Sequence, residues 1–182
     1  MCGGRGTRLD RGEKPLLPIG GRPMVARVVD ALAEARVDAV AAAVSPHVPG
    51  TRALLDDRGD VGVVETPGEG YVADLERALV DFDRPVLTVT ADLPLLDAAT
   101  VDRVLADRPP GAAAVCVPAA LKRRLGASAD TTVRSGDGRE LAPAGLNVVA
   151  GDEDSIMTLD TYRLAVNVNR PRDARVAEAL CD

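Results

Sequence analysis

Short apolar runs alternate along the chain with amphipathic stretches. The amphipathic stretches repeat their apolar residues every three or four positions, which is the spacing of one helix face. They predict helices at residues 23–35, 71–82, 98–106 and 172–180. The apolar runs are rich in valine and alanine and predict strands at residues 40–44, 61–64, 85–90, 112–117, 146–149 and 164–168. Because strands that alternate with helices build a mostly parallel sheet with helices on both faces, we expect an α/β fold.

A different pattern follows after residue 130. Residues 131–141 enclose the turn signal Ser135-Gly136-Asp137-Gly138, which predicts a hairpin and therefore an antiparallel edge to the sheet. The chain has 182 residues and contains no internal repeat or low-complexity linker. We therefore expect a single domain over residues 1–182.

The charge balance excludes several classes of protein. Lys and Arg number 22 against 28 Asp and Glu, and the net charge of −6 argues against a protein that coats a nucleic-acid backbone. Aromatic residues make up 2% of the chain, too few for a platform that stacks on single-stranded bases. No apolar run approaches the roughly 18 residues that a membrane span needs. We expect neither nucleic acid nor a membrane span.

The composition is also biased within each charge class. Lys14 and Lys122 are the only lysines, so arginine supplies almost all of the positive charge. This bias is typical of a chain adapted to a concentrated-salt cytoplasm, and equally of a genome rich in G and C. The three cysteines follow no metal-ligand spacing, and His47 is the single histidine. These residues indicate free thiols in a reducing, cytoplasmic environment and give little support to a zinc site or a His-dependent triad.

A glycine-rich segment near the start of the chain carries the strongest chemical signal. In Gly3-Gly4-Arg5-Gly6-Thr7-Arg8 the glycines allow several backbone N–H groups to approach a polyphosphate. Arg8 and the later Lys14 can balance phosphate charge, so both are candidate catalytic residues. The spacing matches neither a Walker loop nor the dinucleotide fingerprint.

Such a loop normally follows the central strand of the sheet, yet only Met1 and Cys2 precede it here. Without that strand, ladder groups of both neighbouring strands are unpaired, and each such buried group costs on the order of 1–3 kcal/mol. We therefore expect the first strand to be missing from this sequence and the natural chain to begin upstream of Met1.

The glycine loop, with Lys14-Pro15 downstream, resembles the loop of nucleotidyltransferases that use a nucleoside triphosphate and release pyrophosphate. Within this superfamily, which includes the molybdenum-cofactor guanylyltransferases, later segments resemble the archaeal-type adenosylcobinamide-phosphate guanylyltransferases. These segments are residues 44–51, 66–75, 143–149, 154–160 and 165–171.

The resemblance implies a Rossmann-like nucleotidyltransferase fold and a specific reaction. The enzyme would transfer GMP from GTP to adenosylcobinamide phosphate, giving adenosylcobinamide-GDP and pyrophosphate in cobalamin biosynthesis. The implied partners are GTP and a phosphorylated corrinoid, and a homodimer is compatible with the sequence.

Asp92 follows the buried strand at residues 85–90, at the carboxyl edge where ligands bind in open α/β sheets. A carboxylate there can hold Mg²⁺ that bridges the triphosphate, and the resemblance makes Asp92 the metal-binding aspartate of the catalytic set. Asn169, or its neighbour Asn167, resembles the second metal contact, where many relatives carry an aspartate.

The remaining candidates belong to the two substrates. Purine recognition needs backbone and short polar groups, and the candidate nucleotide-binding residues are Gly3, Gly4, Arg5, Gly6, Thr7, Ser45, Thr51, Gly68, Gly70 and Asp74. Gly145 and Asn147 are candidates for the acceptor side. We interpret the basic run at residues 122–124 as an exposed face and leave it out of the site.

Three alternatives stay open at this point. The same chemistry could act on molybdopterin or a sugar phosphate. A GTP-binding regulator without turnover is consistent with two asparagines in place of a second acid. A truncated, inactive product is consistent with the missing first strand.

Overall fold

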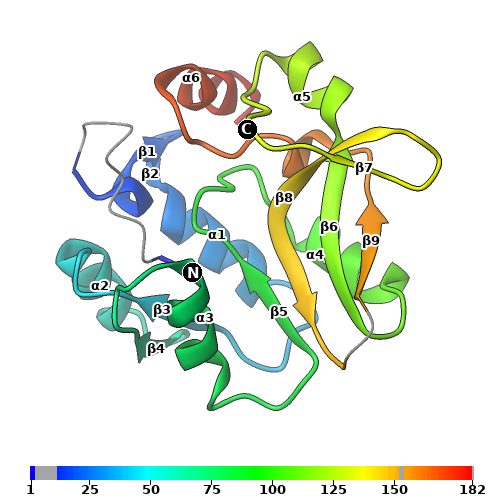
Figure 1. Cartoon of the computed structure of the whole chain (residues 1–182). Coiled ribbons are helices and arrows are strands. Elements are labelled where there is room, and N and C mark those ends of the chain that lie inside the picture. Colours follow the sequence, from blue (N-terminus) through cyan, green and yellow to red (C-terminus); the bar gives the residue numbers. More distant parts are fainter. Residues whose placement is uncertain (3–11, 152–153, 182) are drawn as a thin grey trace.

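The computed structural model describes residues 1–2, 12–151 and 154–181, and its centre is a five-stranded sheet (Figure 1). Four strands lie side by side in the order β5 (Val86–Val89), β8 (Glu140–Val149), β6 (Ala112–Pro118) and β9 (Asp154–Thr158). β7 (Val133–Arg134) pairs with the first residues of β8. β8 is antiparallel to β5 and β6, and β9 is parallel to β6. β5, β6 and β9 therefore run in one direction and β8 in the other.

This arrangement confirms the α/β fold, with helices on both sides of the sheet, and the hairpin between β7 and β8. The antiparallel strand, which the sequence analysis placed at an edge, lies inside the sheet instead. β8 carries Leu141, Leu146 and Val148 into the core, so most of its length is buried. A buried strand must pair its backbone on both sides, which accounts for its internal position.

A second, smaller sheet lies beside the first. β3 (Ala41–Val44) and β4 (Gly62–Glu65) form a parallel pair. The Cys2 amide donates to the Ala43 carbonyl at 2.9 Å, and the Ala91 amide donates to the Met1 carbonyl at 3.2 Å. A mostly apolar cavity of about 440 Å³ extends between β3 and β5. Met1 and Cys2 therefore link the two sheets through backbone hydrogen bonds, and the cavity lies beside them.

Helices flank both sheets. They are α1 (Met24–Ala33), α2 (Pro49–Asp56), α3 (Tyr71–Leu79), α4 (Ala98–Asp107), α5 (Ala119–Leu125) and α6 (Pro171–Leu180). Shorter elements are the 3₁₀ turns η1 (Lys14–Leu16) and η2 (Tyr162–Leu164) and the hairpin of β1 (Pro18–Ile19) and β2 (Arg22–Pro23). In Figure 1, α5 and α6 lie at the upper end of the large sheet, and α2 and α3 lie near β3 and β4.

The strand predicted at residues 164–168 is wrong. This run contains the end of η2 and a loop, although Leu164, Ala165 and Val166 are fully buried. The run is apolar because it packs in the core, and a short apolar run does not distinguish a buried loop from a strand. α2, α5 and β9 were not predicted from the sequence, because each is short and interrupted by polar residues.

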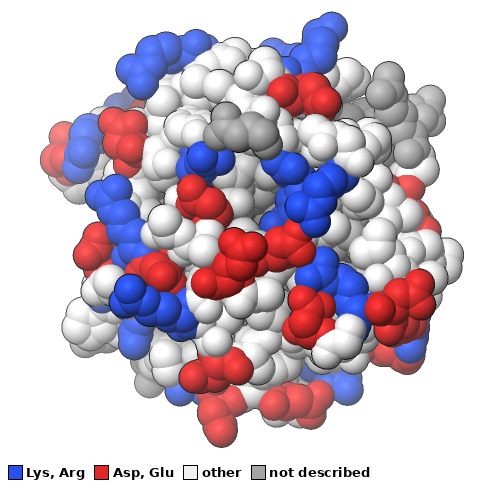
Figure 2. Space-filling view, turned by 180° about the vertical axis from the view of Figure 1, so that it is seen from behind, with Lys and Arg blue, Asp and Glu red and all other residues white. Residues whose placement is uncertain are grey.

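The surface mixes charges of both signs. Figure 2 shows Lys and Arg interspersed with Asp and Glu over the face opposite that of Figure 1. Ion pairs such as Arg58–Asp60 at 2.6 Å and Arg123–Glu140 at 2.7 Å belong to this pattern. The face in Figure 2 therefore offers no continuous basic surface for a nucleic-acid backbone. Within the described residues, no helix has the length and apolar character to cross a membrane.

Candidate active site

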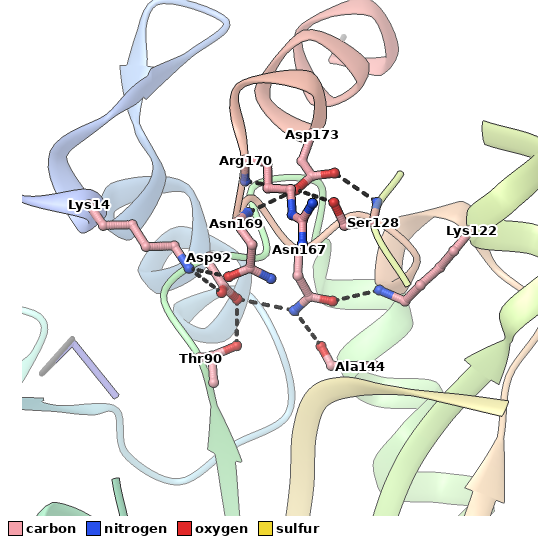
Figure 3. Close-up of polar contacts among 10 residues, drawn as sticks. All are labelled: Lys14, Thr90, Asp92, Lys122, Ser128, Ala144, Asn167, Asn169, Arg170 and Asp173. Carbon is pink, nitrogen blue, oxygen red and sulfur yellow. Dashed lines mark hydrogen bonds and ion pairs between the residues drawn. The ribbon is translucent and has the colours of Figure 1, made fainter. Parts of the chain in front are cut away.

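Asp92 lies just beyond the carboxyl end of β5, and three side chains donate to its carboxylate (Figure 3). Lys14 Nζ donates to Oδ2 at 2.6 Å, Thr90 Oγ1 donates to Oδ1 at 2.7 Å and Asn167 Nδ2 donates to Oδ1 at 3.1 Å. Burial alone would raise the pKa of Asp92, but the Lys14 ammonium and these hydrogen bonds outweigh it, so the pKa lies below its usual range. Asp92 is therefore held as a carboxylate.

A second oxygen faces the same ammonium group. Asn169 Oδ1 accepts from Lys14 Nζ at 2.8 Å, so the oxygens of Asp92 and Asn169 converge on one positive charge. Carboxylate and amide oxygens are the donors that hard divalent cations prefer. The described residues contain no group of three or more His, Cys, Asp or Glu that could hold a metal ion. These two oxygens fit a cation that draws its remaining ligands from substrate and water.

Asn167 has a different orientation. Its Oδ1 accepts from Lys122 Nζ at 2.8 Å, and its Nδ2 donates to Asp92 and to the Ala144 carbonyl at 2.9 Å. Lysine can only donate and an ionised aspartate can only accept, so these partners fix which way the amide points. Of the two asparagines, Asn169 directs its oxygen toward the Lys14 charge, whereas Asn167 directs its oxygen toward Lys122.

The sequence analysis expected Lys122 to lie on an exposed face, and this expectation is wrong. Arg123 and Arg124 on α5 are exposed, but Lys122 is only 3% exposed. Burial lowers the pKa of Lys122, and the charges of Asp92 and Asp173 partly offset this effect. Because Lys122 is next to two exposed arginines, its burial could not be predicted from the local sequence. The only sequence feature that distinguishes Lys122 is that lysine is rare in this chain.

Asp173 is a further residue that the sequence analysis missed. It lies in the first turn of α6 and is fully buried. Its carboxylate accepts from the amides of Asn169 at 3.1 Å, Arg170 at 2.9 Å and Ser128 at 2.8 Å, and from Ser128 Oγ at 3.0 Å. These bonds tie the Asn169 loop to the segment after α5, so Asp173 fixes the backbone from which Asn169 projects.

A cavity of about 750 Å³ opens next to Lys14 and Asp92. Gly68, Gly70 and Asp74, which the sequence predicts to bind the nucleotide, line it, and so does His47, which was not among those candidates. Gly68 and Gly70 have φ angles of +74° and +124°, which favour glycine. Asp74 accepts from the Gly68 amide at 2.7 Å, and His47 Nε2 donates to the Gly68 carbonyl at 3.1 Å. These two side chains hold the glycine turn at the cavity wall.

Ser45 and Thr51 are not among the described residues that line this cavity. Thr51 is fully buried, and its hydroxyl and amide both donate to Glu13 at 2.6 Å. Glu13 also accepts from the Gly50 amide at 2.7 Å and thereby caps the start of α2. Burial would raise the pKa of Glu13, but these hydrogen bonds outweigh it and hold the pKa below its ordinary value. Ser45 Oγ accepts from the His47 amide at 3.4 Å.

Gly145 and Asn147 lie on β8, and only Gly145 contacts the Asp92 cluster. The Gly145 carbonyl accepts from the Thr90 amide at 2.8 Å, and a Cβ at residue 145 would lie 2.4 Å from Thr90 Oγ1. Asn147 is half-buried, and its backbone pairs with Thr88 in the middle of β5. The candidates Gly3, Gly4, Arg5, Gly6, Thr7 and Arg8 lie outside the described residues.

The chain is similar to several known proteins. Residues 1–133 match the family model of the MobA-like NTP transferase domain. An adenosylcobinamide-phosphate guanylyltransferase from Methanocaldococcus jannaschii is 30% identical over 99% of this chain and 94% of the relative. A solved structure of a hypothetical transferase from Thermus thermophilus has a TM-score of 0.60 at 28% identity, covering 81% of this chain and 60% of that one. A CMP-2-keto-3-deoxy-manno-octonic acid synthetase solved with CTP has a TM-score of 0.65 at 15% identity, covering 94% and 93%, which shows the fold alone.

Proposed function

Because the chain belongs to the MobA-like NTP transferase family, we propose that it transfers GMP from GTP to adenosylcobinamide phosphate and releases pyrophosphate. The similarity that supports this acceptor extends over 99% of the chain. The observation that carries the chemistry is the convergence of Lys14, Asp92 and Asn169 at the edge of a cavity large enough for a nucleotide. The alternative of a GTP-binding regulator without turnover has no specific support in this geometry.

In the proposed reaction, a phosphate oxygen of the acceptor attacks the α-phosphorus of GTP in line. The new P–O bond forms while the bond between the α-phosphorus and the bridging oxygen breaks, and pyrophosphate leaves with that electron pair. A phosphate monoester is already nucleophilic near neutral pH, so the site needs no strong general base. Positioning and neutralisation of charge then supply the rate enhancement.

Lys14 supplies a mobile positive charge in this scheme. Its ammonium group contacts Asp92 and Asn169, and it also borders the cavity, so it can turn to a phosphate without leaving the site. Mg²⁺, when bound with the nucleotide, would be held by Asp92 Oδ2 and Asn169 Oδ1 and would neutralise phosphate charge. The proposed phosphate cradle is Gly3 to Thr7 together with Arg8.

The guanine side of the proposed site is the turn at Gly68 and Gly70. Asp74 and His47 hold this turn, and Ser45 and Thr51 support the neighbouring segment from outside the cavity. Gly145 and Asn147 remain proposed acceptor-side residues. The cysteines at residues 2, 116 and 181 form no disulfide with one another, which supports a reducing, cytoplasmic setting.

The test is a pyrophosphate-release assay in KCl with Mg²⁺ and GTP, with and without cobinamide phosphate, and with ATP as the control nucleotide. Release that needs both GTP and the corrinoid is the expected result. GTP binding without release would redirect the assignment to another phosphorylated acceptor or to a regulator. Equal release with ATP would contradict a guanine-specific site.

A further inference from the structure

Both lysines of this arginine-rich chain meet in the same cluster of side chains. Lys14 comes from η1 and Lys122 from α5, yet they contact Asp92 and its neighbour Asn167 (Figure 3). Of the 22 basic residues, these two are the only ones that are not arginine. Both lysines of the chain therefore lie at one place. There a compact ammonium group with three donors offers hydrogen-bond geometry that a planar guanidinium does not.

Burial of Lys122 requires compensation. Removing an ammonium group from water is costly unless it is hydrogen-bonded and has opposite charges nearby. Lys122 is 3% exposed, its Nζ donates to Asn167 Oδ1 at 2.8 Å, and Asp92 and Asp173 supply negative charge. Lys122 does not line the 750 Å³ cavity, so it does not serve as a direct substrate contact there.

The hydrogen bonds of Asn167 carry the effect of Lys122 to Asp92. With its oxygen committed to Lys122, Asn167 directs one N–H to Asp92 Oδ1 and the other to the Ala144 carbonyl. Oδ1 of Asp92 is then fixed by Asn167 and Thr90, which leaves Oδ2 facing Lys14, where the proposed function would place the cation. We propose that Lys122 is a positioning residue, which acts through Asn167 to orient Asp92 toward the metal–nucleotide complex.

This inference rests on the proposed function, but its test does not require turnover. The variants are Lys122→Met and Asn167→Ala, singly and together, with Arg124→Met as the matched control on an exposed position of the same helix. Binding of Mn²⁺, alone and with GTP, is measured by water-proton relaxation, and thermal unfolding checks that each variant is folded. Lys122→Leu, which also lacks a donor, replaces Lys122→Met if that variant does not fold.

The expected result is an about tenfold weaker Mn²⁺ affinity for Lys122→Met, the fold-change of one lost hydrogen bond to a charged group. Asn167→Ala should give a similar loss, the double variant should be no worse than either single one, and Arg124→Met should bind as wild type. Electrostatics alone predicts the opposite sign, because removal of a cation strengthens attraction for a metal. Unchanged or tighter Mn²⁺ binding, or losses that multiply in the double variant, would overturn the proposal.

The two ideas can fail separately. If the wild type releases no pyrophosphate with cobinamide phosphate, but Lys122→Met still weakens Mn²⁺ binding, the proposed acceptor is wrong and the positioning role stands. In the converse case, turnover is guanine- and corrinoid-dependent while Lys122→Met leaves Mn²⁺ affinity and kcat unchanged. The function then stands and the positioning role is rejected.

Discussion

Replacing Gly145 by alanine separates a packing role from a role in acceptor binding. A Cβ at residue 145 would lie 2.4 Å from Thr90 Oγ1 and 3.1 Å from Asn167 Nδ2. The φ angle of +79° adds a backbone conformation that costs an L-residue about 1–2 kcal/mol. Crowding in a packed region typically adds about 1–3 kcal/mol. We therefore expect Gly145→Ala to lower the free energy of unfolding by about 2–5 kcal/mol.

Gly138 is the matched control, because its φ angle is +83° and no described heavy atom beyond its chain neighbours lies within 4 Å of an added Cβ. Gly138→Ala should cost only the backbone contribution, about 1–2 kcal/mol. For a domain of this size, 1 kcal/mol shifts Tm by about 2–4 °C. Thermal unfolding followed by circular dichroism should show Tm lowered by about 4–20 °C for Gly145→Ala and about 2–8 °C for Gly138→Ala.

A second variant identifies the atom responsible. Thr90→Ala in the Gly145→Ala background removes the nearest clashing atom, so it should restore part of the lost Tm. The packing argument would be refuted by equal Tm values for Gly145→Ala and Gly138→Ala. A raised KM for the phosphorylated acceptor, together with such equal Tm values, would assign Gly145 to acceptor binding instead.

Four further predictions concern the charged groups. Lys14→Ala should lower kcat by about 10²-fold with a much smaller change in Tm, because Asp92 keeps its hydrogen bonds from Thr90 and Asn167; wild-type turnover would remove Lys14 from the mechanism. Asp92→Asn should raise the metal concentration for half-maximal turnover, since every partner of Asp92 is a donor and an amide satisfies fewer of them. The pKa of Glu13 is lowered in the folded protein, so its contribution to stability is present above the unfolded-state pKa and is lost as the pH falls through the folded-state pKa. Glu13→Gln should therefore be less stable than wild type at neutral pH, and urea unfolding should show that difference shrinking on acidification. Stability that rises between low salt and molar KCl would support adaptation to concentrated salt, and unchanged stability would leave only the genomic explanation.

Strand order placed Asp92 at the proposed reactive centre. Asp92 follows the most regular buried strand, and carboxyl ends of parallel strands are where open α/β sheets bind ligands. Lys14 and Asn169 follow from motif resemblance, and the fold places both against Asp92. The glycine turn at residue 68 was likewise predicted, because turns that need positive φ select glycine.

Other features depend on contacts that a local pattern does not contain. The local sequence around Glu13 does not show its role, because its partners, the amides of residues 50 and 51, belong to α2. The sequence shows Asp173 only as an acid in the first turn of a predicted helix. Its role depends on hydrogen bonds from the amides of Ser128 and Asn169. Lys122 sits beside two exposed arginines, and only the packing of α5 against the sheet separates it from them. In each case the partner is distant in the chain.

The position of both lysines in one cluster also gives the protein a built-in spectroscopic label. Incorporation of [¹⁵N]lysine would yield two side-chain ammonium resonances, and both would arise from groups bonded to Asp92, Asn167 or Asn169. The two signals can be assigned by comparing wild type with Lys14→Ala alone. Titration with nucleotide, metal or acceptor would then be observed directly at the centre, without assignment of any other residue in the chain.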